Sequence, residues 1–187
     1  MKKITIALLL SVLTLPTFAE TNKTNVMFGD KINSITLYAT QSTGPGTLFK
    51  LINPTIWDFY PQTLVLFQYS QPMQFFRLDS RLNFNLTQNF AYNDDKGLSF
   101  FAASVSIDTA LLQYHNWYLG IGIGPYMRDS RDRWVESRLV FGEKFFIGKS
   151  LNENWNFELY TIHFSNGNFT NANEGFNFVG FGVGYKF

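Results

Sequence analysis

Residues 76–92 alternate between apolar and polar side chains over a longer stretch than a strand of a soluble protein needs. Phe, Leu and Tyr dominate one set of alternate positions, and Arg, Asp, Asn and Thr fill the other. Because successive side chains of a β-strand point to opposite faces, this period of two predicts one long strand with an apolar and a polar face. Strands of globular proteins have about 5–6 residues, whereas tilted strands that cross a bilayer need about 9–11. The pattern therefore favours a membrane-spanning sheet.

The same alternation recurs along most of the chain. Short turns separate some of the alternating segments, and longer or more charged loops separate the others, 44–61 and 166–175 being the longest. Segment 135–149 is the least regular, because Glu143 shares a face with apolar residues, and a β-bulge near Gly142 would turn it inward. We expect eight strands, at residues 32–43, 62–70, 76–92, 98–108, 117–127, 135–149, 154–165 and 176–187.

An even number of strands, with short turns at one end and longer loops at the other, is typical of an all-β, eight-stranded antiparallel transmembrane β-barrel. The composition agrees with this fold, since 45% of residues are hydrophobic but the mean hydropathy is only -0.07, so apolar and polar residues are finely interleaved. A soluble lipocalin-like barrel would instead place the bulky residues inside. Glycines lie opposite the bulky face of two strands, where a crowded narrow lumen needs small residues: Gly120, Gly122, Gly124, Gly180, Gly182 and Gly184.

The N-terminus has the outline of a secretory signal peptide. Lys2 and Lys3 precede a short apolar run, and a Thr-Phe-Ala tripeptide at 17–19 offers small residues for cleavage. The apolar run is too short to span a bilayer. We therefore expect a signal peptide at residues 1–19 and a single barrel domain at 20–187. Without the two lysines, the 15 basic residues fall to 13 against 14 acidic ones, so no nucleic-acid partner is expected.

The outward face of the strand at 154–165 changes character near its end. Apolar positions give way to His163 and Ser165, which are about 6.6–6.8 Å apart along the strand. A His within reach of a Ser is the minimal activated nucleophile, and polar groups on a lipid face are costly and tend to be functional. Asn177 on the next strand shares the outward parity and can orient the imidazole, while Glu174 in the preceding loop is the other candidate. We favour Asn177 because its parity faces His163.

Residues 161–187 contain His163-Phe164-Ser165-Asn166, an Asn- and Gly-rich loop, and then Asn173-Glu174-Gly175-Phe176-Asn177 before a Gly-alternating last strand. This arrangement resembles the lipid A 3-O-deacylase family of the PagL type. The resemblance implies an eight-stranded barrel in the outer membrane of a Gram-negative bacterium. It also implies hydrolysis of the ester-linked 3-hydroxyacyl chain at the 3 position of lipid A, with no cofactor.

The resemblance further implies a nucleophile, a base and an oxyanion site: Ser165, His163, and Asn166 with backbone N–H groups near Gly167 and Asn168. The acidic third residue of the family falls on Asn177, which is a departure. An Asn can still orient a His, but it cannot stabilise an imidazolium by charge. The catalytic set is therefore His163, Ser165 and Asn177, unless Glu174 substitutes for the last.

Two outer loops offer contacts for a lipid A substrate. Arg128, Arg131 and Arg133 are suited to pair with phosphates, although the pattern favours a solvated loop over a phosphate site. Loop 44–61, which includes Trp57, is strongly apolar for an exposed loop. It either rests on the membrane or an acyl chain, or simply extends the adjacent strands. Nothing in the sequence has the ligand spacing of a metal site, so no metal is expected.

Other functions remain open at this point. A non-enzymatic small barrel, such as an adhesin or a structural protein, would leave His163 and Ser165 as incidental residues, and another lipid-modifying barrel, such as a phospholipase, would use them on a different substrate. The terminal Phe187 resembles the last residue of outer-membrane barrels. We therefore expect lipopolysaccharide, outer-membrane lipid and the barrel-assembly machinery as partners, with a homodimer left open. His115 is expected in a solvated turn.

Overall fold

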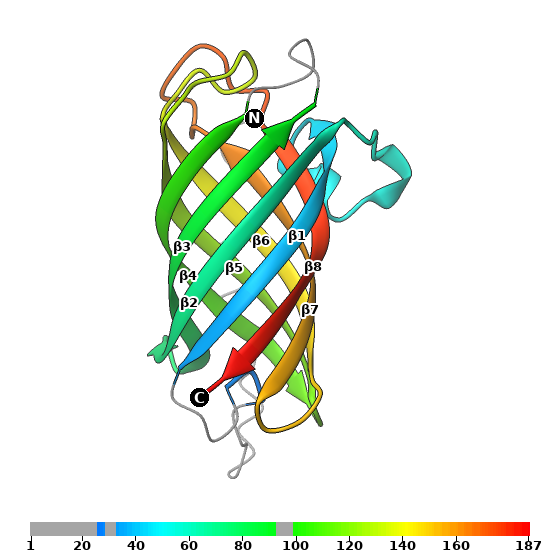
Figure 1. The fold of residues 1–187 in the computed structure, drawn as a ribbon, viewed down its shortest axis with the longest axis vertical. Coiled ribbons are helices and arrows are strands. Elements are labelled where there is room, and N and C mark those ends of the chain that lie inside the picture. Colours follow the sequence, from blue (N-terminus) through cyan, green and yellow to red (C-terminus); the bar gives the residue numbers. More distant parts are fainter. Residues whose placement is uncertain (1–25, 29–32, 93–98) are drawn as a thin grey trace.

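The computed structural model describes residues 26–28, 33–92 and 99–187, and these form a closed barrel of eight antiparallel strands. Each strand pairs with its neighbours in the chain, and the first strand closes the barrel on the last (Figure 1). The predicted fold is therefore confirmed, whereas the expected signal peptide lies outside the described residues. The strands are β1 Ser34–Pro45, β2 Gln62–Phe75, β3 Leu78–Ala91, β4 Phe100–Tyr114, β5 Trp117–Arg128, β6 Leu139–Ser150, β7 Trp155–Ser165 and β8 Phe176–Lys186.

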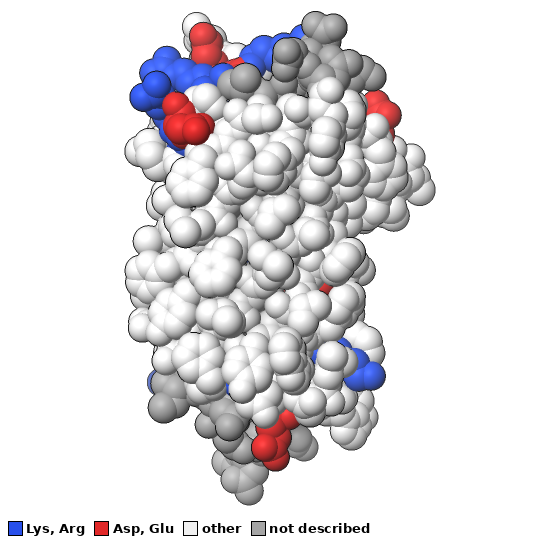
Figure 2. Space-filling model, in the orientation of Figure 1, with Lys and Arg blue, Asp and Glu red and all other residues white. Residues whose placement is uncertain are grey.

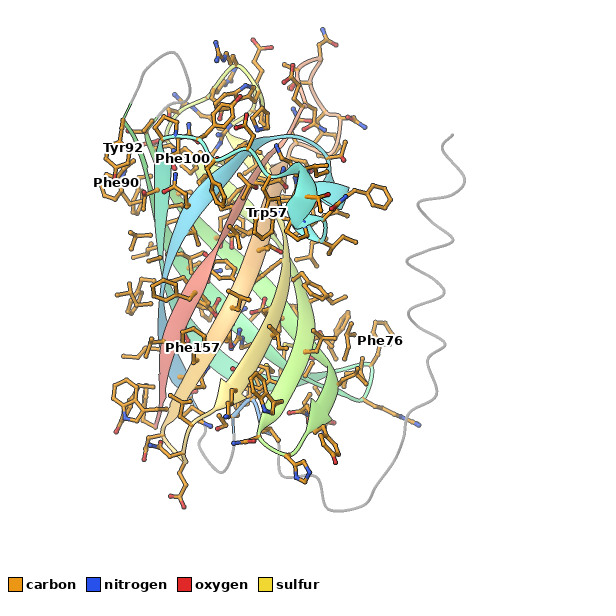
Figure 3. The ribbon with its side chains drawn as sticks, turned by 90° about the vertical axis from the view of Figure 1, so that its right-hand side faces the viewer. Trp57, Phe76, Phe90, Tyr92, Phe100 and Phe157 are labelled. Atoms are coloured by element: carbon orange, nitrogen blue, oxygen red, sulfur yellow. The ribbon has the colours of Figure 1, made fainter. Side chains whose placement is uncertain are left out.

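Alternate side chains point into and out of the barrel, as the period of two predicts. Phe181, at an outward position of β8, is 53% exposed, whereas Asn83, at an inward position of β3, is fully buried. Figure 3 shows the outward side chains, many of them aromatic, standing around the wall. Inside, Gly182 faces Tyr38 so closely that a Cβ would lie 2.3 Å from the tyrosine ring. Outward positions thus carry mostly apolar residues, whereas the interior combines polar side chains with buried aromatic ones. A lipocalin-like barrel would instead keep polar residues on its outer surface.

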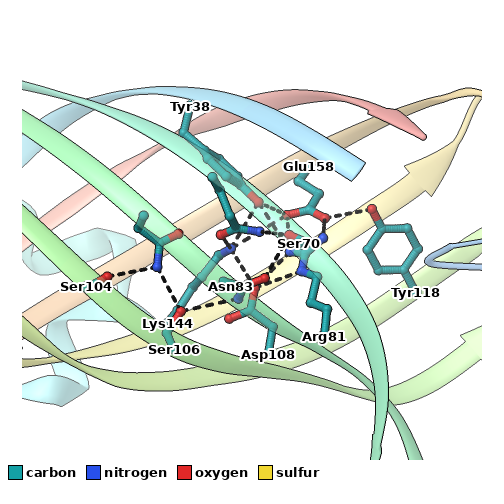
Figure 4. A network of polar contacts seen from close by, with 12 residues as sticks. Tyr38, Ser70, Arg81, Asn83, Ser104, Ser106, Asp108, Tyr118, Lys144 and Glu158 are labelled. Atoms are coloured by element: carbon teal, nitrogen blue, oxygen red, sulfur yellow. Dashed lines mark hydrogen bonds and ion pairs between the residues drawn. The ribbon is translucent and has the colours of Figure 1, made fainter. Parts of the chain in front are cut away.

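A charge-balanced network fills the lumen (Figure 4). The Arg81 guanidinium donates to Glu158 Oε1 at 2.7 Å and to Asp108 Oδ2 at 2.8 Å. Lys144 Nζ donates to the same Asp108 oxygen at 2.9 Å, and the Tyr38 hydroxyl donates to Glu158 at 2.6 Å. These two cations and two anions are almost inaccessible to solvent. Their pairing allows charges to stay buried inside a barrel that is too narrow for an open pore.

The two ends of the barrel differ. Connections at one end are short, whereas the loops that follow β1, β3, β5 and β7 at the other end are longer. Charged residues gather at both ends of the face shown in Figure 2, and the band between them is almost entirely uncharged. Such a band suits the hydrocarbon core of a bilayer. No helix in the described ranges is long and apolar enough to cross a membrane.

The turn between β2 and β3 lies further along the chain than the sequence predicts. β2 runs through Pro72 to Phe75, so residues 71–75, which were expected to connect two strands, belong to the strand. Pro is tolerated there because β1 pairs with β2 only as far as Ser70, which leaves the rest of β2 as an edge. The turn consists of Phe76 and Arg77, whose φ values of 48° and 66° suit a two-residue hairpin.

Two other predicted bounds also shift. β4 continues to Tyr114, so that the following turn contains His115, as expected. β6 begins at Leu139, because residues 135–138 belong to the loop before it. The β1–β2 loop, residues 46–61, does not extend its strands. It folds into two short 3-10 helices, η1 Leu48–Leu51 and η2 Pro54–Ile56, and projects sideways from the wall near the long-loop end (Figure 1).

Candidate active site

A polar row crosses the outer surface of the barrel near the long-loop end. Strand pairing places Gly44 of β1, Asn177 of β8, His163 of β7 and Glu143 of β6 opposite one another in turn. Ser165 lies two residues beyond His163 on β7 and therefore shares its face. The His, Ser and Asn predicted from sequence thus lie together on one outward surface, which we call the polar row, and Glu143 joins them.

The polar row is covered although its positions face outward. Leu159, on the same face of β7, is 50% exposed, but His163 is only 6% exposed and Asn177 is fully buried. Helix η1 of the β1–β2 loop packs against these two strands. Gly175 closes against the imidazole, because a Cβ there would lie 2.3 Å from His163 Cε1, and its φ of +71° also favours glycine. The imidazole is therefore held in an enclosed position on the barrel wall.

Asn177 fixes the orientation of the imidazole. Its Oδ1 lies 2.9 Å from His163 Nδ1, and its amide N–H groups donate to the carbonyl oxygens of Gly46 at 3.1 Å and Gly44 at 3.4 Å. Because carbonyl oxygens only accept, the amide nitrogen must face them and the amide oxygen must face the imidazole. His163 therefore donates from Nδ1 and keeps its lone pair on Nε2. Glu174, the other candidate for this position, is exposed in the loop before β8.

An irregularity in β1 brings those carbonyls to Asn177. The pairing of β1 with β8 shifts between Ser42 and Gly44, and Gly44 has a φ of 85°. The Gly46 N–H then donates to the Gly175 carbonyl at 3.2 Å. This contribution was not predicted from the sequence, although the Gly-Pro-Gly run at 44–46 is a recognisable break in a strand pattern.

Glu143 lies in the site although the sequence did not predict it there. β6 pairs without interruption with both β5 and β7 through Gly142, so the suggested bulge is absent and Glu143 faces outward. The Ser165 hydroxyl donates to Glu143 Oε1 at 3.4 Å, and in this structure it is not hydrogen-bonded to His163. The second carboxylate oxygen, Oε2, is buried without a hydrogen-bond partner among the described residues. A carboxylate on an apolar face was the available signal for this position.

Asn166 organises the turn that follows β7. Its amide nitrogen donates to Thr170 Oγ1 at 2.5 Å and to the Ala172 carbonyl at 2.9 Å, and its oxygen accepts from the Asn168 N–H at 2.9 Å. Gly167 and Asn168 both have positive φ values, 64° and 65°. Of the expected oxyanion donors, the Asn166 amide and the Asn168 N–H are thus engaged within the turn. The Gly167 N–H has no hydrogen-bond partner in the described part of the chain.

The three arginines expected to meet phosphates have different positions. Arg128 is only 2% exposed, and its guanidinium donates to the carbonyls of Val135 at 2.7 Å and Ser137 at 2.6 Å. It therefore closes the loop between β5 and β6 and does not face the lipid headgroups. Arg131 and Arg133 are exposed in that loop.

Trp57 lies in the β1–β2 loop, beside the ends of the strands that carry the polar row (Figure 3). It is half-buried, and its indole N–H donates to the Lys50 carbonyl at 2.6 Å. No three His, Asp or Glu side chains gather as metal ligands would, within the residues that the structure describes. A hydroxyl, an imidazole with a lone pair on Nε2 and a backbone N–H nearby are instead the groups that acyl transfer requires.

A family model identifies the relatives of this chain. The model described as Lipid A 3-O-deacylase (PagL) matches residues 62–186, more than half of the chain. The chain belongs to the lipid A 3-O-deacylase (PagL) family. The match includes the strands of His163, Ser165, Asn177 and Glu143, and it begins just after the β1–β2 loop.

Solved structures share the fold of this PagL-family chain. A crystal structure of Neisserial surface protein A (NspA) is 12% identical, has a TM-score of 0.55, and aligns over 83% of this chain and 97% of its own. A crystal structure of the outer membrane enzyme PagL is 13% identical, has a TM-score of 0.53, and aligns over 82% and 99%. The comparison with curated proteins found no match. Family and fold together place the chain in the outer membrane of a Gram-negative bacterium.

Proposed function

We propose that this chain hydrolyses the ester-linked 3-hydroxyacyl chain at the 3 position of lipid A, with Ser165 as nucleophile. The observation that carries the proposal is the contact between His163 Nδ1 and Asn177 Oδ1 at 2.9 Å. It leaves the lone pair of Nε2 to act as a base on the same face as the Ser165 hydroxyl. Membership of the family supplies the substrate class, and the arrangement of the site supplies the chemistry.

The reaction proceeds through an acyl-enzyme. The Ser165 hydroxyl turns from Glu143 to His163, since catalytic hydrogen bonds are often long or misaligned before substrate binds. Its proton passes to His163 Nε2 as Oγ attacks the ester carbonyl. The imidazolium then protonates the departing sugar oxygen, and the acyl group stays on Ser165. A water molecule activated by the same imidazole hydrolyses this ester and restores the hydroxyl.

Glu143 offsets the missing charge at Asn177. An amide at that position fixes the imidazole but carries no negative charge to stabilise an imidazolium. Glu143 lies directly opposite His163 across the β6–β7 pair, where facing side chains have Cβ atoms about 4.5–5.5 Å apart. A carboxylate at that position stabilises the positive charge from the other side of the ring and also accepts the resting Ser165 hydroxyl.

The turn at 166–168 receives the oxyanion. The Gly167 N–H is the donor that is unengaged in the described structure, while Asn166 and Asn168 hold the turn in shape. If Asn166 also contributes its side chain, its amide must first leave Thr170 and Ala172. Preorganised donors of this kind typically contribute about 10²–10³-fold to the rate.

The position of the site suits a membrane-bound ester. The polar row lies on the outer wall near the long-loop end, where the loop between β7 and β8 joins the two strands. A lipid A molecule can approach sideways within the bilayer, so that its sugar-linked ester meets Ser165 without entering a deep pocket. Arg131 and Arg133 are exposed in a loop at the same end, and we propose that they contact the phosphates.

Mass spectrometry of lipid A from cells that express the protein tests this function. The wild-type chain should remove one 3-hydroxyacyl group, and Ser165→Ala should remove none. His163→Ala should be equally inactive, whereas His115→Ala, which alters the other histidine in a turn, should be fully active. Unchanged lipid A with a correctly folded wild-type barrel would favour a non-enzymatic role, and release of fatty acid from phospholipid alone would favour a phospholipase. Insertion by the barrel-assembly machinery and a homodimer stay predictions.

A further inference from the structure

The β1–β2 loop exposes a set of large apolar side chains that the barrel does not use. Their exposed fractions are high for a loop with an ordered backbone: Leu48 49%, Phe49 71%, Ile52 63%, Ile56 51% and Phe59 61%. Single exposed apolar residues are normal on proteins, but a contiguous group of this kind marks an interaction surface. We define this group as the apolar loop surface.

The loop is folded, and several of its polar groups pair within it. The N–H groups of Lys50, Ile56 and Trp57 donate to carbonyls within the loop, and the Trp57 indole N–H donates to the Lys50 carbonyl. The Lys50 ammonium donates to the Pro45 carbonyl at 3.0 Å instead of standing free. Each such pair lowers the cost of placing the loop's apolar side chains against the headgroup and acyl boundary of a bilayer.

The loop lies at the depth of the uncharged band. Figure 1 shows it standing out sideways from the barrel wall, and Figure 2 shows its flank as mostly uncharged surface that continues into the band around the barrel. Leu51 is buried, whereas its neighbours Phe49 and Ile52 are exposed. The apolar loop surface is therefore continuous with the surface that faces lipid.

From this placement we propose that the apolar loop surface is embedded among the acyl chains of the outer leaflet. The occupant is lipid, because the surface is apolar and joins the lipid-facing band, and because a Trp sits at its base, as is common where proteins meet the membrane interface. The loop precedes residues 62–186, which the family model covers, so it is a feature of this chain outside the shared region.

The embedded loop is connected directly to the polar row. Gly46, at its start, accepts a hydrogen bond from Asn177 and donates one to Gly175, and helix η1 packs against β7 and β8. The loop thus joins the lipid phase to the residue that orients His163. Acyl chains that lie against Phe49 and Ile52 are held beside the same strand ends that carry Ser165.

A depth measurement tests the embedding without reference to enzyme activity. The chain contains no Cys, so Phe49→Cys can carry a single environment-sensitive fluorophore in the full-length barrel reconstituted into phosphatidylcholine vesicles. Ile52→Cys provides a second probe of the same surface, and Asn171→Cys, exposed in the β7–β8 loop, is the control. Aqueous iodide and lipids brominated on their acyl chains serve as quenchers from the two phases.

We expect iodide to quench the labels at 49 and 52 several-fold less than the label at 171, and the brominated lipids to show the opposite order. Equal iodide quenching at 49, 52 and 171, with no effect of the brominated lipids, would overturn the proposal. Because the readout is the depth of a label, a barrel that failed to deacylate lipid A would still give a clear answer here.

Discussion

At the scale of single residues, Asn177 determines what the imidazole of His163 can do. The carbonyls of Gly44 and Gly46 face its amide nitrogen, so its oxygen must accept from Nδ1. A carboxylate would fit this position poorly, because its second oxygen would face two carbonyl oxygens. The surroundings of residue 177 therefore suit an amide better than a carboxylate.

Asn177→Asp tests this reason. We expect the added charge to lower activity instead of raising it, because the new oxygen repels Gly44 and Gly46 and displaces the side chain. A positioned base typically contributes about 10²–10⁴-fold to the rate. Asn177→Ala should lower kcat by less than this full factor. The measurement is the rate of 3-O-acyl release by each purified variant, with Glu174→Ala as the exposed control. An Asp variant faster than wild type would contradict the arrangement.

Glu143→Gln separates two roles for the carboxylate. The Gln side chain keeps an acceptor oxygen for the Ser165 hydroxyl, so the variant should retain measurable activity if Glu143 only positions Ser165 and His163. Because the Gln carries no negative charge, it should stabilise the imidazolium less than Glu143 does. We expect kcat to fall with little change in KM, and Glu143→Ala to be more severe. Steady-state kinetics on vesicles that contain lipid A provide the comparison. If Glu143→Gln were as inactive as Ser165→Ala, Glu143 and not His163 would be the base.

At the scale of elements, period-two alternation was sufficient to predict eight strands and the outward parity of His163, Ser165 and Asn177. It failed where local chemistry decides the outcome. A connection was expected at residues 71–75, but the edge of β2 accommodates Pro72. The turn lies at Phe76 and Arg77, neither of which is a typical turn residue. For Glu143 and the β1 irregularity the sequence carried only local signals, a carboxylate on an apolar face and a Gly-Pro-Gly run. Which residues they contact depends on the register between strands, which one sequence does not display.

The exposed apolar side chains of the β1–β2 loop should contribute to activity on a membrane-bound substrate. The double variant Phe49→Ser with Ile52→Ser removes two of its most exposed apolar side chains without touching the polar row. We expect deacylation of lipid A in vesicles to fall about tenfold, because the loop loses part of its hold on the lipid phase. Phe76→Ser, at an equally exposed aromatic residue in a turn at the other end, is the control. Equal activity of both variants would separate the loop from catalysis.

At the scale of the whole molecule, the barrel separates the surrounding lipid from an interior that holds paired charges and buried aromatic side chains. Aromatic and aliphatic side chains line the outside, and Arg81, Lys144, Asp108 and Glu158 balance one another inside. The interior network leaves the outer wall as the available surface for chemistry. The alternation of apolar and polar residues along the strands predicted an apolar outer face and a polar inner face. The pairing of the interior charges was visible only in three dimensions.

Glu158→Gln tests the contribution of the interior. Its carboxylate accepts from Arg81, Tyr38 and Tyr118, so its neutralisation leaves two buried cations with one anion. Breaking a buried pair in this way typically costs about 3–5 kcal/mol. We expect a lower free energy of unfolding for the barrel in urea with lipid vesicles, whereas Glu153→Gln, in an exposed turn, should leave it unchanged. Equal stability of the two variants would show that the network is not a stabilising feature.

The most direct test of the outward catalytic centre is covalent labelling of the folded barrel with a serine-reactive phosphonate, followed by mass spectrometry of its peptides. The label should be found on Ser165 in the wild-type protein, should disappear in His163→Ala, and should persist in His115→Ala. Labelling of a different serine, or equal labelling of Ser165 in wild type and His163→Ala, would contradict a nucleophile activated by His163 on the outer wall.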